Sequence, residues 1–227
     1  ITEGVKLSNM QGPDGRVQTK RLPALSPEGI EQAIAALNQG EAIAFPTDTV
    51  YGVGAHAFQA QAVARLYAIK ERPSNVPIPL LLPDVSALDS VCIHVPPLAW
   101  RIAERFWPGG LSLVLYRAPV VPGVVTAGRD TLAVRVPQHA LVRDMCRRLG
   151  APLAATSANL HGQPAPASAD DVMRGLEGRI PLLLDGGLCP GGIASTLLDM
   201  TVSPPVLLRS GPITVEQLAA FVPLGSD

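Results

Sequence analysis

The chain has 227 residues, of which 47% are hydrophobic and only 16% are charged, so its composition is that of a folded globular protein and not of a disordered one. Its formal net charge of −1 excludes a uniformly basic nucleic-acid binder but is compatible with a local basic groove. The three cysteines, Cys92, Cys146 and Cys189, lack the spacing of a metal site, and we expect reduced thiols.

The N-terminal segment is polar and rich in glycine. We therefore expect an irregular arm over residues 1–24 and a single folded domain over residues 25–222. The arm has no apolar segment typical of a secretory signal, and no apolar run in the chain approaches the ~18 residues of a membrane span. The sequence predicts a cytoplasmic protein that has no membrane partner.

Helical and extended patterns alternate along the rest of the chain. Apolar residues at helical spacing predict helices over residues 26–40, 59–70, 96–107, 139–150, 169–178 and 214–222. Apolar or alternating runs predict strands over residues 42–45, 78–82, 111–116, 131–137, 152–156, 181–185, 194–200 and 205–209. Residues 46–57 are expected to form a turn-rich loop. This order predicts a single-domain α/β fold with a twisted, mostly mixed sheet flanked by helices.

Sequence motifs of common enzyme classes do not occur in this chain. It has no phosphate-binding P-loop, zinc-protease motif or nucleophile elbow, and its four histidines show no metal-ligand spacing. The segment GVGAHA (52–57) matches a dinucleotide fingerprint in form, but six residues separate Gly52 from the preceding strand, so we do not expect a Rossmann loop. No metal ligands are predicted.

Polar residues gather instead at the ends of apolar strands, where α/β sheets bind ligands. They are Thr47, Asp48, Thr49 and Tyr51 after the first strand, Ser157 and Asn159 after the fifth, Ser195 and Thr196 near the seventh, and Arg209 and Ser210 at the last. Thr, Ser and Asn are also ordinary turn and cap residues, and that alternative remains open for any single one of them.

Arg135 lies in the middle of the alternating strand 131–137, on the same face as Thr131 and Ala133. A guanidinium in this position needs an anionic partner or a wet cleft, because burying it unpaired is costly. The equal alternative is an edge strand with Arg135 in water.

Lys70 and Arg72 stand at a predicted helix end, just before Pro73. Lys70 is explained by the negative end of the helix dipole alone. Arg72 is not, because Pro73 disfavours the helical conformation for it. Two cations on a rigid turn can clamp phosphate oxygens. With Arg135 and Arg209 they predict a cleft for a small polyanionic ligand that carries phosphate or carboxylate.

At this point the sequence resembles the YrdC/Sua5 family of L-threonylcarbamoyladenylate synthases. The resemblance spans residues 26–221 and rests on seven segments in the same order: FPTDTVYGVGAHA, KERPSNVPIPLLL, WPGGLSLVLYR, TLAVRVP, AATSANLHGQPAP, ASTLLDM and LLRSGPI. It implies a YrdC/DHBP synthase-like fold with an open concave ligand cleft, of the short single-domain type. It also implies synthesis of threonylcarbamoyl-AMP and pyrophosphate from ATP, L-threonine and bicarbonate.

The family pattern also implies roles for single residues. It makes Lys70 and Arg72 candidate catalytic residues. The candidates for ATP are Lys70, Arg72, Thr131, Ser157, Asn159 and Arg209. The candidates for threonine are Thr49, Arg135 and Ser195, with Arg135 pairing the carboxylate. Mg²⁺ would arrive with ATP. The product would pass to a downstream threonylcarbamoyl transferase complex for the t6A modification of tRNA adenosine 37, and contact with tRNA or double-stranded RNA is compatible with the fold.

Three positions depart from the family pattern: Val76 stands where Asn or Lys is common, and His161 and Ala165 stand where serines are common. Val76 and Ala165 keep open a degenerate paralogue that has lost activity. A non-catalytic RNA-binding protein is a second alternative, against which the neutral overall charge argues. A third is a carbamoyl-adenylate site like that of hydrogenase maturation proteins, which carry further domains.

Overall fold

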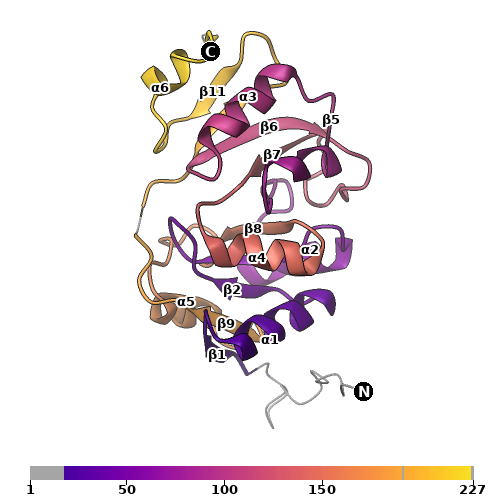
Figure 1. Ribbon diagram of the computed structural model, residues 1–227. Coiled ribbons are helices and arrows are strands. Elements are labelled where there is room, and N and C mark those ends of the chain that lie inside the picture. The colour runs from indigo at the N-terminus through magenta and orange to yellow at the C-terminus, as the bar shows by residue number, and fades with distance from the viewer. Residues whose placement is uncertain (1–17, 191, 226–227) are drawn as a thin grey trace.

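The structure is a computed structural model that describes residues 18–190 and 192–225 (Figure 1). Its α-helices are α1 (Pro27–Asn38), α2 (Ala60–Lys70), α3 (Pro97–Phe106), α4 (Ala140–Leu149), α5 (Ala169–Leu176) and α6 (Val215–Ala219), and a 3₁₀ helix η2 (Val85–Ser90) precedes β5. The strands are β1 (Lys20–Pro23), β2 (Ile43–Phe45), β3 (Gly52–His56), β4 (Leu80–Leu81), β5 (Cys92–Ile93), β6 (Leu111–Arg117), β7 (Thr131–Arg135), β8 (Leu153–Ser157), β9 (Leu182–Asp185), β10 (Thr196–Asp199) and β11 (Val206–Arg209).

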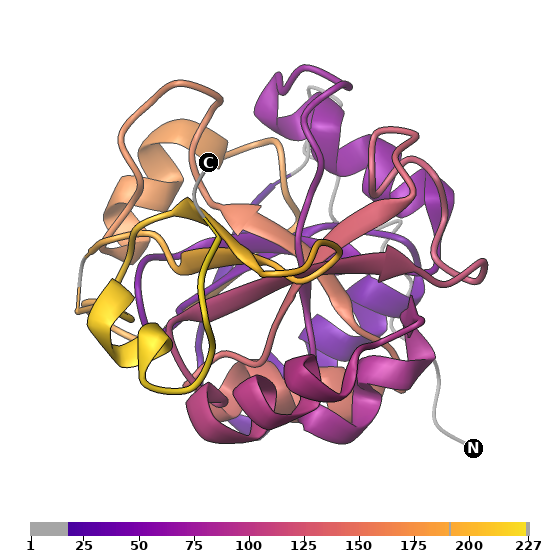
Figure 2. The same cartoon turned by 90° about the horizontal axis from the view of Figure 1, so that it is seen from above.

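All eleven strands form one sheet in the order β1-β9-β2-β3-β8-β4-β7-β6-β10-β11, with β5 beside β6. The sheet is mixed, since β4–β7 and β6–β10 are parallel pairs and β3–β8 and β6–β7 are antiparallel pairs. The predicted single α/β domain with a mixed sheet is confirmed. The sheet twists along its length, with α1 and α5 near the β1 end and α3 and α6 near the β11 end (Figures 1 and 2).

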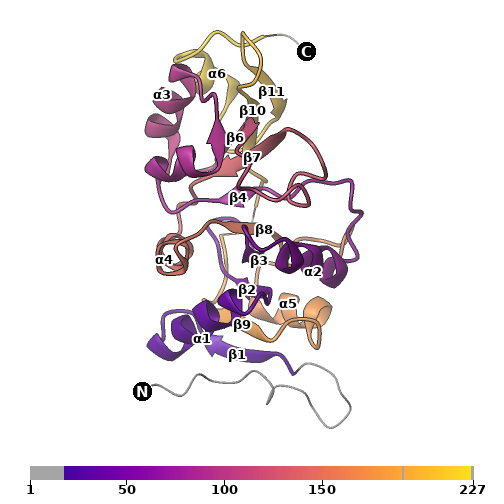
Figure 3. The same cartoon turned by 90° about the vertical axis from the view of Figure 1, so that its right-hand side faces the viewer.

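Helices lie on both faces of the sheet from its β1 end to its middle, where α4 and α2 stand on opposite sides of β3 and β8 (Figure 3). Side chains of α1 and α4 share one apolar cluster with Phe45 and Leu153. Side chains of α2, α3 and α5 belong to a second and larger cluster with Val53, Leu80 and Leu113. Burying apolar surface on both faces stabilises this sheet and explains why strands such as β2, β8 and β9 lack polar alternation.

Local signals set the helix ends as the sequence predicts. The Ser26 hydroxyl accepts a hydrogen bond from the Gly29 amide at 3.0 Å, and Pro27 occupies the first turn of α1. Helix α2 ends at Lys70 because Glu71 adopts a left-handed conformation with φ of 53°. Arg72 therefore leaves the helix, as the proline after it predicts.

Two strands correct the sequence-based expectations. β3 occupies residues that were expected to form a loop, because glycines within a short run indicate a turn or a break. In the fold, Gly52 and Gly54 lie against the Phe45 ring, and a Cβ on either would come within 3.1 Å of that ring. β1 lies inside the expected irregular arm, which is therefore wrong for residues 20–23: they pair in parallel with β9. Residues 1–17 lie outside the described residues.

The environment of Arg135 also differs from one expectation. Strand β7 lies between β4 and β6 in the sheet, so the edge-strand alternative is wrong. Arg135 is only 8% exposed, and its charge therefore needs a partner inside the protein.

None of the helices in the described part of the chain combines the length and apolar character that a bilayer crossing requires.

Candidate functional site

A pocket of about 120 Å³ opens where β2, β7 and β8 end and β10 begins. Its walls are formed by residues 47–52, Pro79, Leu81, Ser112, Arg135, Pro137, residues 155–157 and Ser195. We call it the strand-end pocket. It brings together four of the predicted residues: Thr49, Arg135, Ser157 and Ser195. Its volume is below the roughly 300–1,000 Å³ of drug-sized ligand sites, so it suits a small metabolite and not a whole nucleotide.

Arg135 is the cation of this pocket, and its partner is Asp48. One terminal nitrogen, Nη2, donates to Oδ2 of Asp48, and Nε donates to the Gly109 carbonyl at 2.7 Å. The Gln138 amide donates to the same carboxylate oxygen at 3.2 Å. Burial lowers the pKa of Arg135, while the nearby Asp48 carboxylate opposes that shift, and the group remains charged at any ordinary pH. The sequence required an anionic partner for Arg135 but did not identify Asp48.

Hydroxyl groups are the other polar side chains of the strand-end pocket, whose remaining walls are mostly apolar. The Ser112 and Ser195 hydroxyl oxygens lie 2.8 Å apart, and both residues are buried. Thr47 donates to the Val50 carbonyl at 2.6 Å and lies 3.1 Å from the Thr49 hydroxyl. These groups can each donate or accept, so they can orient a polar ligand without adding charge.

Arg209 is joined to the pocket through Ser195. Its Nε and Nη2 donate to the Ser195 carbonyl at 3.0 and 2.9 Å, and Nη2 also reaches the Ser195 hydroxyl at 3.2 Å. Arg209 is exposed at the end of β11, so its remaining donor group is open to an anion from solvent. Thr131 lies farther away, at the start of β7. Arg135 is four positions further along the strand, which corresponds to about 13 Å.

Lys70 lies behind the turn that carries Ser157 and Asn159. Its side chain is only 1% exposed, and its ammonium donates to the backbone carbonyls of both residues. The Lys70 carbonyl in turn accepts from the His161 amide at 2.8 Å. Burial, and secondarily the nearby Arg72 charge, lowers the pKa of Lys70 to about 8. The predicted phosphate contact of Lys70 stays a prediction, and two of its three donors are already used.

Arg72 is half-buried beside Lys70, in the turn between α2 and β4. Its Nε donates to the Val76 carbonyl at 3.2 Å and its Nη2 to the Pro77 carbonyl at 2.9 Å. These bonds close the turn around the guanidinium and fix its direction. Burial lowers the pKa of Arg72, which still remains protonated. Val76 takes part in this turn through its carbonyl, which any residue could supply.

Asn159 lines a second pocket, of about 450 Å³, with Leu160, residues 163–167 and three residues of α5, Asp171, Arg174 and Gly175. Its side-chain nitrogen donates to the Leu160 and Gln163 carbonyls at 2.8 and 2.6 Å. Ser157 lines the strand-end pocket instead. The Ser-x-Asn turn therefore separates two cavities, and Ala165 contributes to the second.

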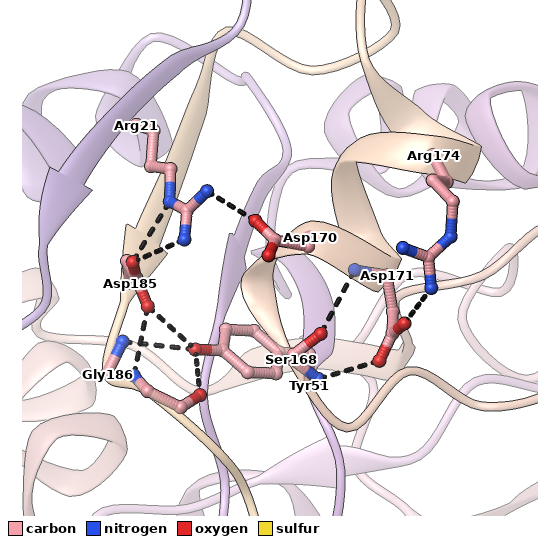
Figure 4. Close-up of polar contacts among 9 residues, drawn as sticks. Arg21, Tyr51, Ser168, Asp170, Asp171, Arg174, Asp185 and Gly186 are labelled. Carbon is pink, nitrogen blue, oxygen red and sulfur yellow. Dashed lines mark hydrogen bonds and ion pairs between the residues drawn. The ribbon is translucent and has the colours of Figure 1, made fainter.

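Tyr51 anchors the segment after β9, which leads on to Ser195 (Figure 4). Its hydroxyl donates to the Gly187 carbonyl at 2.7 Å and accepts from the Gly186 amide at 3.0 Å. The Asp185 carboxylate lies close to the same hydroxyl, with its Oδ1 at 3.3 Å. Arg21 of β1 forms an ion pair with this carboxylate, with Nη2 2.8 Å from Oδ2. Burial raises the pKa of Tyr51 to about 12, so the phenol remains neutral. This anchor was not predicted from the sequence.

Reactive cysteines and clusters of metal-binding side chains are absent from the described residues. The three cysteines are free and buried, and burial raises the pKa of each thiol, so they remain protonated and poorly nucleophilic. Within residues 18–190 and 192–225, no three His, Cys, Asp or Glu side chains are placed to hold a metal ion.

Comparison with known proteins places the chain in a family. The model of the Sua5/YciO/YrdC family, described as "Telomere recombination", matches residues 35–211, and the chain belongs to this family. The threonylcarbamoyl-AMP synthase of Bacillus subtilis is 44% identical over 194 residues, and that of Pyrococcus abyssi is 41% identical over 193 residues. Each alignment covers 85% of this chain but only 56% and 57% of the respective relative, so the chain spans little more than half their length.

A solved structure supports the same placement. The crystal structure of Pyrococcus abyssi Sua5 complexed with L-threonine superposes with a TM-score of 0.84 at 37% sequence identity. The match covers 92% of this chain and 62% of that one. The family resemblance seen in the sequence and the YrdC-type fold that it implied are confirmed. The open concave cleft remains a prediction.

Proposed function

We propose that the protein is an L-threonylcarbamoyladenylate synthase, which forms threonylcarbamoyl-AMP and pyrophosphate from ATP, L-threonine and bicarbonate. The observation that carries this proposal is the strand-end pocket, which places a buried guanidinium among hydroxyls beside the Ser-x-Asn turn. Support comes from the names of two relatives above 40% identity and from a structural neighbour that binds L-threonine.

The threonine would occupy the strand-end pocket. Nε and Nη2 of Arg135 donate hydrogen bonds to Gly109 and Asp48. Its Nη1 donates no hydrogen bond to any of the described residues, so Nη1 can donate to the substrate carboxylate. Thr49 and Ser195 would orient the amino acid through their hydroxyls. The small volume of the pocket fits this substrate and leaves the nucleotide outside it.

The ATP would lie across the mouth of the pocket. Arg72 and Arg209 are two cations that each keep an unused donor, and Ser157 and Asn159 are the polar residues of the intervening turn. Thr131 shares the face of β7 with Arg135, so an extended nucleotide could reach both. Lys70 supports the turn from behind through its two carbonyl contacts. Mg²⁺ is part of the substrate, carried on the phosphates of ATP.

The proposed chemistry needs no covalent intermediate with the protein. The threonine amine adds to CO₂ from bicarbonate and forms a carbamate with loss of a proton. A carbamate oxygen then attacks the α-phosphorus, and pyrophosphate leaves as the bond to the β-phosphate oxygen breaks. Holding both reactants in place and neutralising the phosphates supply the catalysis.

The wider setting is also a proposal. The product would pass to a downstream threonylcarbamoyl transferase complex that modifies adenosine 37 of tRNA, in the cytoplasm. The proposal also includes direct contact of this chain with tRNA or double-stranded RNA.

Pyrophosphate release tests the proposed function. ATP is supplied with threonine and bicarbonate, and each of the last two is omitted in turn. We expect release only with the complete set, and we expect Arg72→Ala and Arg135→Ala to abolish it. Arg148→Ala is the matched control, since this exposed arginine pairs with Asp144 on α4 and should release pyrophosphate normally. Release that continues without threonine would contradict the proposal.

A further inference from the structure

The strand-end pocket contains one positive and one negative charge. Asp48 and Arg135 are the only charged side chains among the described residues that line it. Tyr51, the other titratable wall residue, remains neutral because burial raises its pKa to about 12. The other polar wall groups are hydroxyls. The pocket therefore has a formal charge of zero, and both charges are concentrated in a single ion pair.

This ion pair is largely shielded from water. The side chains of Arg135 and Asp48 are 9% and 16% exposed, and each is held by a further backbone contact, to Gly109 and Gln138 respectively. Charges in such a dry site interact with a ligand more strongly than charges at the surface do. An added anion or cation would leave one uncompensated charge in a poorly solvated place, which is costly.

A zwitterion is the ligand that keeps the charges balanced. Its carboxylate adds an anion near Arg135, and its ammonium adds a cation near Asp48. We propose that Asp48 is a specificity-determining residue that makes the pocket select free α-amino acids over simple carboxylate anions. This inference rests on the proposed function, in which L-threonine occupies this pocket. Arg135 alone would accept either class of carboxylate.

Other charged groups nearby do not replace Asp48 in this role. Arg209 reaches the pocket only through Ser195 and is exposed, so it favours an anion outside the pocket. His139, the N-cap residue of α4, lies within electrostatic range of Asp48 and of Arg143, but neither His139 nor Arg143 lines the pocket. A purely structural role for Asp48, that of holding Arg135 in place, predicts a different outcome, which the following experiment separates.

Isothermal titration calorimetry with two ligands tests the inference. L-Threonine is compared with 3-hydroxybutyrate, which is threonine without its amine, each with and without a non-hydrolysable ATP analogue. We expect the wild-type protein to bind threonine at least about tenfold more tightly than 3-hydroxybutyrate. In Asp48→Asn, threonine should bind about tenfold more weakly while 3-hydroxybutyrate binds more tightly, so the preference should vanish or reverse. Asp144→Asn, which removes an exposed carboxylate of α4, is the control and should keep the wild-type preference.

The outcomes separate the inference from the proposed function. If the wild-type protein binds no threonine, the proposed function is wrong and the inference is wrong with it. If it binds both ligands equally, or if Asp48→Asn weakens both in parallel, threonine binding stands and the role of Asp48 in selection is refuted. If Asp48→Asn does not fold, Asp48→Glu keeps the charge and should keep the preference for threonine. Loss of that preference in Asp48→Glu would also refute the inference.

Discussion

The buried ammonium of Lys70 gives a prediction that can be worked out from its contacts. Lys70→Met keeps the length of the side chain but removes the ammonium, which leaves the carbonyls of Ser157 and Asn159 without this partner. A hydrogen bond that involves a charged group contributes about 1.5–3 kcal/mol. Removing the ammonium also removes the cost of burying it, which offsets part of the loss. We expect the free energy of unfolding to fall by about 3 kcal/mol near neutral pH.

Urea denaturation followed by circular dichroism measures this change, and Lys20→Met is the matched control. Lys20 also has two acceptors, Glu28 at 3.1 Å and Gln32 at 3.0 Å, but its side chain is 41% exposed. Ion pairs exposed to water contribute about 0–1 kcal/mol to the free energy of unfolding, so this free energy should change little in Lys20→Met. If Lys70→Met costs no more than Lys20→Met, the reasoning that Lys70 stabilises the Ser-x-Asn turn is refuted.

The pH dependence of the same variant supplies a second test. Burial, reinforced by Arg72, lowers the pKa of Lys70 to about 8 from its ordinary 10.5. Between these values the unfolded chain binds a proton that the folded protein does not, so the stability of the wild-type protein rises with pH. The variant lacks this group, so the stability difference between the two proteins should widen by roughly 2 kcal/mol from about pH 7 to about pH 9.5. A constant difference would show that the folded protein keeps Lys70 charged.

Three further changes have definite expected results. Ser112→Ala removes the hydroxyl 2.8 Å from Ser195, and we expect the KM for threonine to rise severalfold with little change in kcat, measured by pyrophosphate release. Tyr51→Phe removes the hydroxyl that holds the Gly187 carbonyl, and chemical denaturation should show a loss of about 1–2 kcal/mol. Ser168→Ala removes the N-terminal cap of α5 and should cost about 1 kcal/mol in the same assay, without changing the KM for threonine. An unchanged KM in the first variant, or unchanged stability in the other two, would contradict these contacts.

Local sequence determined most of the helices and their ends. Ser26 with Pro27, and Pro73 after Arg72, act on the backbone within a few residues, so their effects could be predicted without knowledge of the fold. The strand β3 could not be predicted in this way. Its glycines favour a loop locally, and only packing against the Phe45 ring, on the neighbouring strand, makes their missing side chains an advantage.

The candidate site also has features that follow from the sequence and features that only the tertiary structure determines. The sequence by itself determined which kinds of residue the site contains, since a guanidinium in an apolar strand requires an anionic partner whatever the fold. Only the tertiary structure decided that Asp48, 87 positions away along the chain, is that partner, that Ser112 joins Ser195, and that Lys70 faces two carbonyls. Such contacts depend on the order of strands in the sheet, which brings distant segments together and which no local pattern of residues encodes.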